Sequence, residues 1–69
     1  MSEQLTLTVN GETRRTATRT IADLVRELDL LPEKVAVEHN GEIAPRSRLA
    51  EIALSDGDML EIVHFVGGG

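Results

Sequence analysis

The sequence predicts an α+β domain in which one mixed sheet of about five strands packs on a single helix. Two Asn-Gly pairs, at Asn10 and Asn40, each follow a short segment typical of a strand, and this dipeptide is a strong signal for a tight hairpin. Between the two hairpins lies one stretch with the apolar spacing of a helix. Strands gathered on one sheet with one helix across it form a two-layer α+β domain. Because 69 residues are enough for one such unit, we expect residues 1–69 to form a single domain.

The first hairpin is indicated by strict alternation of apolar and polar residues. Leu5–Val9 reads Leu-Thr-Leu-Thr-Val, a period of two that is typical of a half-buried strand. Asn10-Gly11 then supplies two residues that tolerate positive φ, as a type I′ turn requires. A return strand over about Glu12–Ala17 follows, with Arg14-Arg15 indicating a solvated edge.

The helix is predicted to begin after Thr20, which suits an N-cap, with Asp23 three residues later in the capping-box position. Pro32 is expected to end the helix and to force Leu31 before it into an extended conformation. Four apolar residues form one stripe on this short helix: Ile21, Leu24, Val25 and Leu28.

The second half predicts another hairpin and a final strand. Val35–His39 and Glu42-Ile43 flank the Asn40-Gly41 turn, so the tripeptide Asn-Gly-Glu occurs in both hairpins. In the irregular segment that follows, Leu49, Ile52 and Ala53 are expected to line one turn of helix. A turn is expected over Ser55–Asp58, and the last strand over Met59–Val66.

Composition excludes several classes of function. A net charge of −5 and a single aromatic residue, Phe65, argue against nucleic-acid binding, which needs a basic surface and stacking rings. The absence of cysteine excludes a disulfide framework, a thiolate nucleophile and a cysteine zinc site. No apolar run approaches the ~20 residues of a membrane span, and no signal peptide is evident. We therefore expect a cytoplasmic protein that binds neither membrane nor nucleic acid.

The sequence offers no catalytic or metal-binding constellation. His39 and His64 alternate within predicted strands without further ligands at suitable spacing, which favours surface or edge positions. Ser47 has no base beside it in sequence that would activate it. Asp56 and Asp58 flank a glycine, and in such turns carboxylates ordinarily accept hydrogen bonds from backbone amides. We expect no catalytic residue and no bound metal.

The unusual feature is the run Gly67-Gly68-Gly69 directly after the last apolar strand. Such a run is ordinarily a frayed chain end. However, three residues without side chains can enter a narrow channel and span at most about 10 Å when extended. We expect a flexible glycine tail whose terminal carboxylate, on Gly69, is ionised at neutral pH and unreactive until another enzyme activates it.

Six segments carry a resemblance to a known family: Val35–Glu38, Asn40–Ile43, Pro45–Ser47, Asp56–Asp58, Glu61–Val63 and Val66–Gly69. Their order and spacing resemble the sulfur carriers of thiamin biosynthesis, the ThiS family, over nearly the whole chain. The resemblance implies a ubiquitin-like β-grasp fold with strand order 2-1-5-3-4. The sequence departs from the family at His39 and Leu49, where an apolar and an aromatic residue are common.

The resemblance implies a carrier that is acted on by enzymes and is not itself an enzyme. A ubiquitin-activating-type adenylyltransferase, ThiF-like, would adenylate Gly69 with ATP. A persulfide from a cysteine desulfurase would convert the adenylate to a thiocarboxylate, and a ThiG-like thiazole synthase would take the sulfur into the thiazole ring. The carrier would bind no cofactor, and Gly67, Gly68 and Gly69 would enter the partners' active sites.

The last strand and the turn before it are the predicted partner surface. Phe65 and Val66 lie at the exit of the tail and suit apolar contacts with partners, although Phe65 equally suits the edge of the core. The acids Asp56, Asp58 and Glu61 are expected to steer a basic partner surface toward the tail.

Three alternatives remain open. The small subunit of molybdopterin synthase shares the β-grasp fold and the diglycine end, although Pro45–Ser47 and Glu61–Val63 favour the thiamin branch. A modifier that is joined to lysines through Gly69 has no positive support in the sequence. An interaction module without sulfur chemistry would need no free terminus, and its partner binding would survive loss of Gly68 and Gly69.

Overall fold

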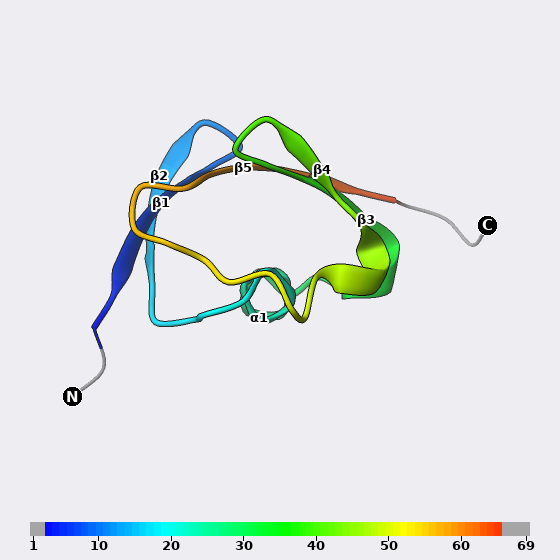
Figure 1. Ribbon diagram of the computed structural model, residues 1–69, viewed down its shortest axis with the longest axis horizontal. Helices are drawn as coiled ribbons and strands as arrows, with labels where there is room; N and C mark the ends of the chain where they lie inside the picture. The colour runs from blue at the N-terminus through cyan, green and yellow to red at the C-terminus, as the bar shows by residue number, and fades with distance from the viewer. Residues whose placement is uncertain (1–2, 66–69) are drawn as a thin grey trace.

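The computed structural model describes residues 3–65, and their elements follow the predicted order (Figure 1). The two sequence-local hairpins and the helix all form as expected. The elements are β1 (Leu5–Val9), β2 (Glu12–Thr16), α1 (Ile21–Glu27), the 3₁₀ turn η1 (Pro32–Lys34), β3 (Val35–His39), β4 (Glu42–Ala44), the 3₁₀ turn η2 (Arg46–Arg48) and β5 (Met59–His64).

The five strands form one mixed sheet in the order β2-β1-β5-β3-β4, which confirms the order that the family resemblance implied. Each Asn-Gly turn joins an antiparallel pair, β1 with β2 and β3 with β4. Asn10 and Asn40 both have a φ of 51°, and the glycines after them also have positive φ, as type I′ turns require. The last strand, β5, is central and runs parallel to β1 and antiparallel to β3.

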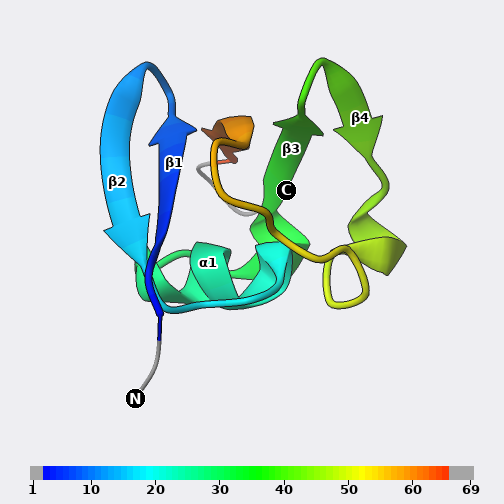
Figure 2. The same ribbon diagram turned by 60° about the vertical axis from the view of Figure 1, so that its left-hand side comes forward.

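One face of the sheet packs on α1, which lies beneath the curved sheet in Figure 1 and across its lower side in Figure 2. Thr20 caps the helix as predicted, because its hydroxyl accepts a hydrogen bond of 3.2 Å from the amide of Asp23. Ile21, Leu24 and Val25 of the predicted stripe are fully buried. The other fully buried large apolar side chains are those of Leu7, Val35, Leu49 and Leu60.

The helix ends earlier than predicted, at Glu27, well before Pro32. Asp29 has a left-handed φ of 64°, which ends the helical path before the proline is reached. Leu31 is extended as predicted, and Pro32 begins η1 instead of ending α1. Smaller differences concern β2, which ends at Thr16, and β5, which ends at His64.

The helical turn predicted around Leu49, Ile52 and Ala53 forms only in part. Arg46–Arg48 form the 3₁₀ turn η2, and a single further turn follows, in which the carbonyl of Arg48 accepts a hydrogen bond of 3.1 Å from the amide of Ile52. The chain then runs past the start of α1. The carbonyls of Leu49 and Ile52 accept hydrogen bonds from the amides of Ala22 and Ile21, at 2.9 and 3.1 Å. The segment thus satisfies helix N-terminal amides that have no partner within the helix.

The one helix of residues 3–65 is too short to cross a lipid bilayer.

Candidate functional site

The site is built around β5, because this strand leads toward the residues predicted to carry the chemistry. Asn10, in the first hairpin turn, holds the middle of the strand through its side chain. Its Oδ1 accepts a hydrogen bond of 2.7 Å from the amide of Ile62, and its Nδ2 donates one of 3.1 Å to the carbonyl of Ile62. Its own amide donates to the carbonyl of Leu60 at 2.9 Å. These bonds continue the parallel ladder beyond the end of β1.

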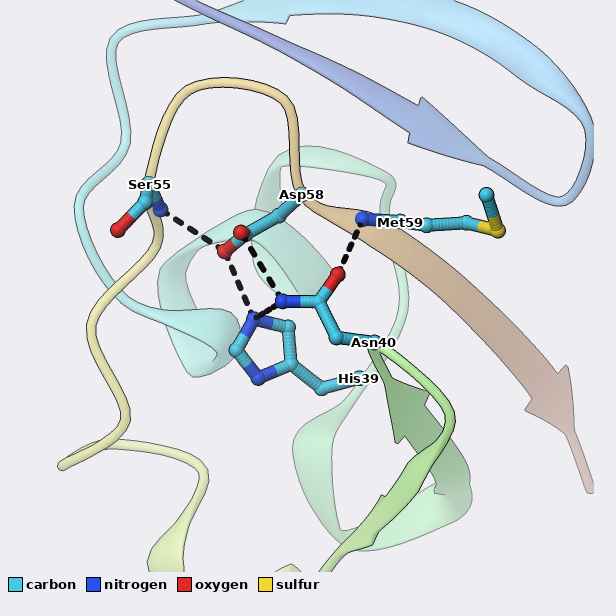
Figure 3. Close-up of polar contacts among 5 residues, drawn as sticks. All are labelled: His39, Asn40, Ser55, Asp58 and Met59. Carbon is cyan, nitrogen blue, oxygen red and sulfur yellow. Dashed lines mark hydrogen bonds and ion pairs between the residues drawn. The ribbon is translucent and has the colours of Figure 1, made fainter.

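Asn40, in the second hairpin turn, holds the start of β5 in the same way (Figure 3). Its Oδ1 accepts a hydrogen bond of 2.9 Å from the amide of Met59, and its own amide donates to the carbonyl of Met59 at 2.8 Å. The repeated Asn-Gly-Glu of the sequence therefore has a shared role: each turn asparagine fixes the backbone of the central strand.

Asp58 collects three donors on one carboxylate, as Figure 3 shows. It accepts hydrogen bonds from Nε2 of His39 at 2.7 Å, from Nδ2 of Asn40 at 3.1 Å and from the amide of Ser55 at 2.9 Å. Burial raises the pKa of Asp58, but these hydrogen bonds and the charge of protonated His39 outweigh that effect and lower its pKa overall. The cluster ties the turn before β5 to the β3–β4 hairpin.

The burial of Asp58 corrects part of the predicted partner surface. Asp58 is 8% exposed, and its carboxylate already accepts hydrogen bonds within the molecule, so it offers little charge to a partner. The alternative expectation, that the acids of this turn accept backbone hydrogen bonds, is confirmed. Asp56 does so as well, because its Oδ1 accepts from the amide of Thr6 at 2.7 Å. Asp56 and Glu61 are exposed, and their contact with a partner stays a prediction.

The two histidines differ from each other. His64 is exposed at the end of β5, as predicted. The side chain of His39 is only 20% exposed and pairs with Asp58, so the expectation of a surface or edge position is wrong for this residue. The departure of His39 from the family pattern is therefore compensated by a buried acceptor.

Phe65 lies just beyond β5 and outside the hydrophobic core. It is 44% exposed, which favours the partner-facing interpretation over the core-edge one. The guanidinium of Arg46 lies 5.6 Å from the centre of its ring, within the range of a cation–π contact. The amide of Phe65 donates to the carbonyl of Lys34 at 2.9 Å, which fixes the backbone there. Val66, Gly67, Gly68 and Gly69 lie outside the described residues.

Within residues 3–65, no group of three or more histidines and carboxylates is placed to hold a metal ion. The sequence did not predict the hydrogen bonds of the two turn asparagine side chains to β5, nor the pairing of His39 with Asp58. The repeated tripeptide was a signal for the former. The sequence also did not predict that Ile43 on β4 and Val63 on β5 are 80% and 59% exposed. Their placement depends on strand register, which the sequence alone left open.

The fold is that of a ubiquitin-like β-grasp protein. It has a mixed sheet of this strand order packed on one crossing helix, and in the sequence a glycine run follows the central last strand. Comparison with known proteins gives the family. Residues 7–69 match the ThiS family, and the chain belongs to that family.

Three known proteins illustrate the relationship. The sulfur carrier protein ThiS of Bacillus subtilis is 50% identical over 52 residues, which cover 75% of this chain and 79% of that protein. A solved structure of the thiamine biosynthesis protein ThiS from Geobacter metallireducens superposes with a TM-score of 0.77 at 33% identity, over 94% of this chain and all of that one. The thiazole synthase of Paramagnetospirillum magneticum is 52% identical over 64 residues, which cover 91% of this chain but 20% of that protein. The chain spans about a fifth of the length of the curated thiazole synthases that it matches.

Proposed function

We propose that this protein is a sulfur carrier of thiamin biosynthesis and that Gly69 bears the sulfur as a thiocarboxylate. The observation that carries the proposal is that the family match runs from residue 7 through Gly69, so it includes the glycine run as well as the folded part. The 50% identity to a protein named as a sulfur carrier supports the same function.

The proposed chemistry takes place at the terminal carboxylate in two stages. First, a carboxylate oxygen of Gly69 attacks the α-phosphorus of ATP in an adenylyltransferase, and pyrophosphate leaves. The resulting acyl adenylate is reactive where the carboxylate was not. Second, the outer sulfur of a protein persulfide attacks the carbonyl carbon, and AMP leaves. A thiol then reduces the acyl disulfide, which leaves the thiocarboxylate on Gly69 and a disulfide on its partner.

The proposed acceptor of the sulfur is a thiazole synthase. Two proteins of that name contain a segment 52% and 40% identical to this chain, which supports an association between the two activities. Covalent linkage of two binding partners raises their effective concentration. The carrier must in either case present a surface that the synthase recognises, and the described part of this chain supplies the candidates.

The folded part contributes a fixed starting point for the reacting end. β5 is hydrogen bonded on both sides in the sheet and again by Asn10 and Asn40, and the amide of Phe65 is bonded to Lys34. An enzyme that recognises this surface can therefore place its catalytic groups at a defined distance from Phe65. Positioning of the reacting groups in this way accounts for a large part of the rate enhancement in enzymatic group transfer.

Removal of Gly69 tests the proposal. The full chain is incubated with ATP and the adenylyltransferase of the same organism, and the acyl adenylate is detected by mass spectrometry. Loss of Gly69 should abolish the adenylate and leave the melting temperature unchanged, since the buried core is formed by residues between Leu7 and Ile62. A chain without Met1 and Ser2 is the matched control and should react normally. Similar adenylate yields with and without Gly69 would contradict the proposal.

A further inference from the structure

The face of the sheet turned away from α1 carries a hollow over β3, β4 and β5. Side chains alternate along these strands, so Val37, Leu60 and Ile62 enter the core while their neighbours point to solvent. The hollow has a volume of about 260 Å³ and is lined by Ala36, Val37, Glu38, Ile43, Glu61 and Val63. None of these residues belongs to the hydrogen-bonded cluster around Asp58.

The hollow exists because a small residue lies between larger ones. Ala36 on β3 is directly opposite Val63 on β5. Ile43 on β4 is opposite Glu38, one outward-facing position further along β3. The short methyl side chain of Ala36 therefore forms the bottom of the hollow, between two larger branched side chains. Ile43 is 80% exposed and Val63 is 59% exposed. Ile43 and Val63 therefore present apolar surface to solvent on both sides of Ala36.

Two carboxylates border the apolar bottom of the hollow. Glu38 and Glu61 are directly opposite each other on antiparallel neighbouring strands, and both are exposed. Like charges in opposed positions destabilise a sheet. Within the part of the chain that the structure describes, the ion pairs use other carboxylates, those of Asp23, Glu27, Glu51 and Asp58. Among residues 3–65, the pair of glutamates thus has no cation within ion-pair distance.

We propose that this hollow binds an arginine side chain on the surface of the thiazole synthase, and this inference rests on the proposed function. The aliphatic stem of an arginine fits over Ala36 between Ile43 and Val63, because long cationic side chains cover apolar surface with their methylene groups. Its guanidinium then lies between Glu38 and Glu61. The charge of the bound group cancels a repulsion that the free protein retains.

Arginine fits this site better than lysine. The planar guanidinium presents donors in several directions and can bond two carboxylates at once, whereas an ammonium is a strongly hydrated point charge. A neutral apolar side chain would fill the hollow but leave both carboxylates partly desolvated and unpaired, at a cost in affinity. The charge and the shape of the hollow therefore both favour an arginine side chain.

The affinity of the full chain for the thiazole synthase of the same organism, measured by titration calorimetry, tests the proposal. The double variant Glu38→Gln/Glu61→Gln should bind at least about tenfold more weakly and lose most of the salt dependence of binding. The matched control Glu3→Gln/Glu12→Gln makes the same change in net charge away from the hollow and should bind within about twofold of the parent. Ile43→Ala should also weaken binding.

Thermal unfolding of Glu38→Gln alone provides a second readout. Removing the repulsion should raise the melting temperature at low salt, by roughly 1 to 5 °C for a domain of this size. A lower melting temperature would show that the pair is already neutralised within the chain and would overturn the proposal. So would parental affinity in the double variant, or a parent that does not bind the synthase. Thiocarboxylate formation on Gly69 is measured separately, so failure here is distinct from failure of the proposed function.

Discussion

At the scale of single residues, Asp58 shows how a buried charge is accommodated next to the central strand. Its carboxylate is almost fully covered, but it accepts hydrogen bonds from His39, Asn40 and the amide of Ser55. A buried carboxylate with several donors is stabilised in its ionised form. The same bonds join two segments that are distant in sequence, the β3–β4 hairpin and the turn before β5, so the residue couples local electrostatics to the placement of β5.

The lowered pKa of Asp58 predicts acid sensitivity. The unfolded chain holds this carboxyl at an ordinary pKa of about 3.9, so the unfolded state binds its proton more readily. The stability that Asp58 contributes is therefore present above about pH 4 and is lost as the pH falls through the lower folded pKa. Asp58→Asn should reduce the free energy of unfolding at pH 7 by ~1–3 kcal/mol and flatten its decline below pH 4.

Chemical denaturation between pH 2 and 7 measures both effects of Asp58→Asn. Asp29→Asn removes an exposed carboxyl at a left-handed position that asparagine also tolerates, and it serves as the control. An acid decline as steep in Asp58→Asn as in the parent would show that this carboxyl does not carry the effect.

Gly68 is predicted to matter for its missing side chain. An active site that encloses an extended glycine chain leaves no room for a Cβ, and small misplacements of a reacting group reduce rates by about a hundredfold. Gly68→Val should therefore slow adenylation by at least about that factor and leave the melting temperature unchanged. Single-turnover kinetics with the adenylyltransferase measure the rate. Turnover close to that of the parent would indicate an open tail site.

Phe65 is predicted to act as a contact for partners. Truncation of a fully buried phenylalanine costs ~3–5 kcal/mol, but Phe65 is 44% exposed, so Phe65→Ala should reduce stability by only about 1 kcal/mol. Loss of an aromatic contact should weaken binding to the adenylyltransferase or the thiazole synthase by ~2 kcal/mol. Denaturation and binding titration separate the two effects. A large loss of stability with unchanged affinity would instead assign Phe65 to the core.

At the scale of elements, β5 is the strand on which the fold depends. It closes the sheet between two hairpins that are local in sequence, and it is held by the side chains of both hairpin turns. Each hairpin forms from neighbouring residues, whereas β5 must find β1 and β3 from far along the chain. The turn asparagines add bonds that are specific for this docking.

Replacement of the turn asparagines by glycine isolates these bonds. Asn10→Gly and Asn40→Gly keep the positive φ of each turn but remove the side-chain amide, so each should reduce the free energy of unfolding by ~1–2 kcal/mol. Asp29→Gly is the matched control, because it also removes a side chain at a positive φ, but one that makes no side-chain hydrogen bond within residues 3–65. Its stability should stay near that of the parent. Equal effects at all three positions would show that glycine itself is responsible.

The elements were predictable to different degrees for physical reasons. The hairpins and the start of α1 depend on local chemistry, namely alternation, the Asn-Gly turns and the Thr20 cap, and the sequence predicts them well. The end of α1 depends on the left-handed Asp29, which has no clear signal in the sequence, so the prediction that Pro32 ends the helix is wrong. The His39–Asp58 pair and the hollow over Ala36 arise from strand register between distant segments. The strand order itself came from the family resemblance.

At the scale of the whole molecule, we propose that recognition and chemistry are located in different parts of the chain. The folded part supplies recognition, through Phe65, the exposed acids and the hollow on the open face of the sheet. In this proposal the glycine run supplies the reacting group, and partner enzymes carry out the chemistry. The net charge of −5 suits partners with basic surfaces, because complementary charge speeds association.

The intact mass of the protein isolated from cells that make thiazole tests the central claim most directly. The proposal predicts a fraction of molecules heavier by the difference between one sulfur and one oxygen, with fragmentation placing that difference on Gly69. Alkylation should remove this species, because a thiocarboxylate is nucleophilic and a carboxylate is not. Protein that carries only a carboxylate on Gly69 under these conditions, or sulfur located elsewhere in the chain, would contradict the account.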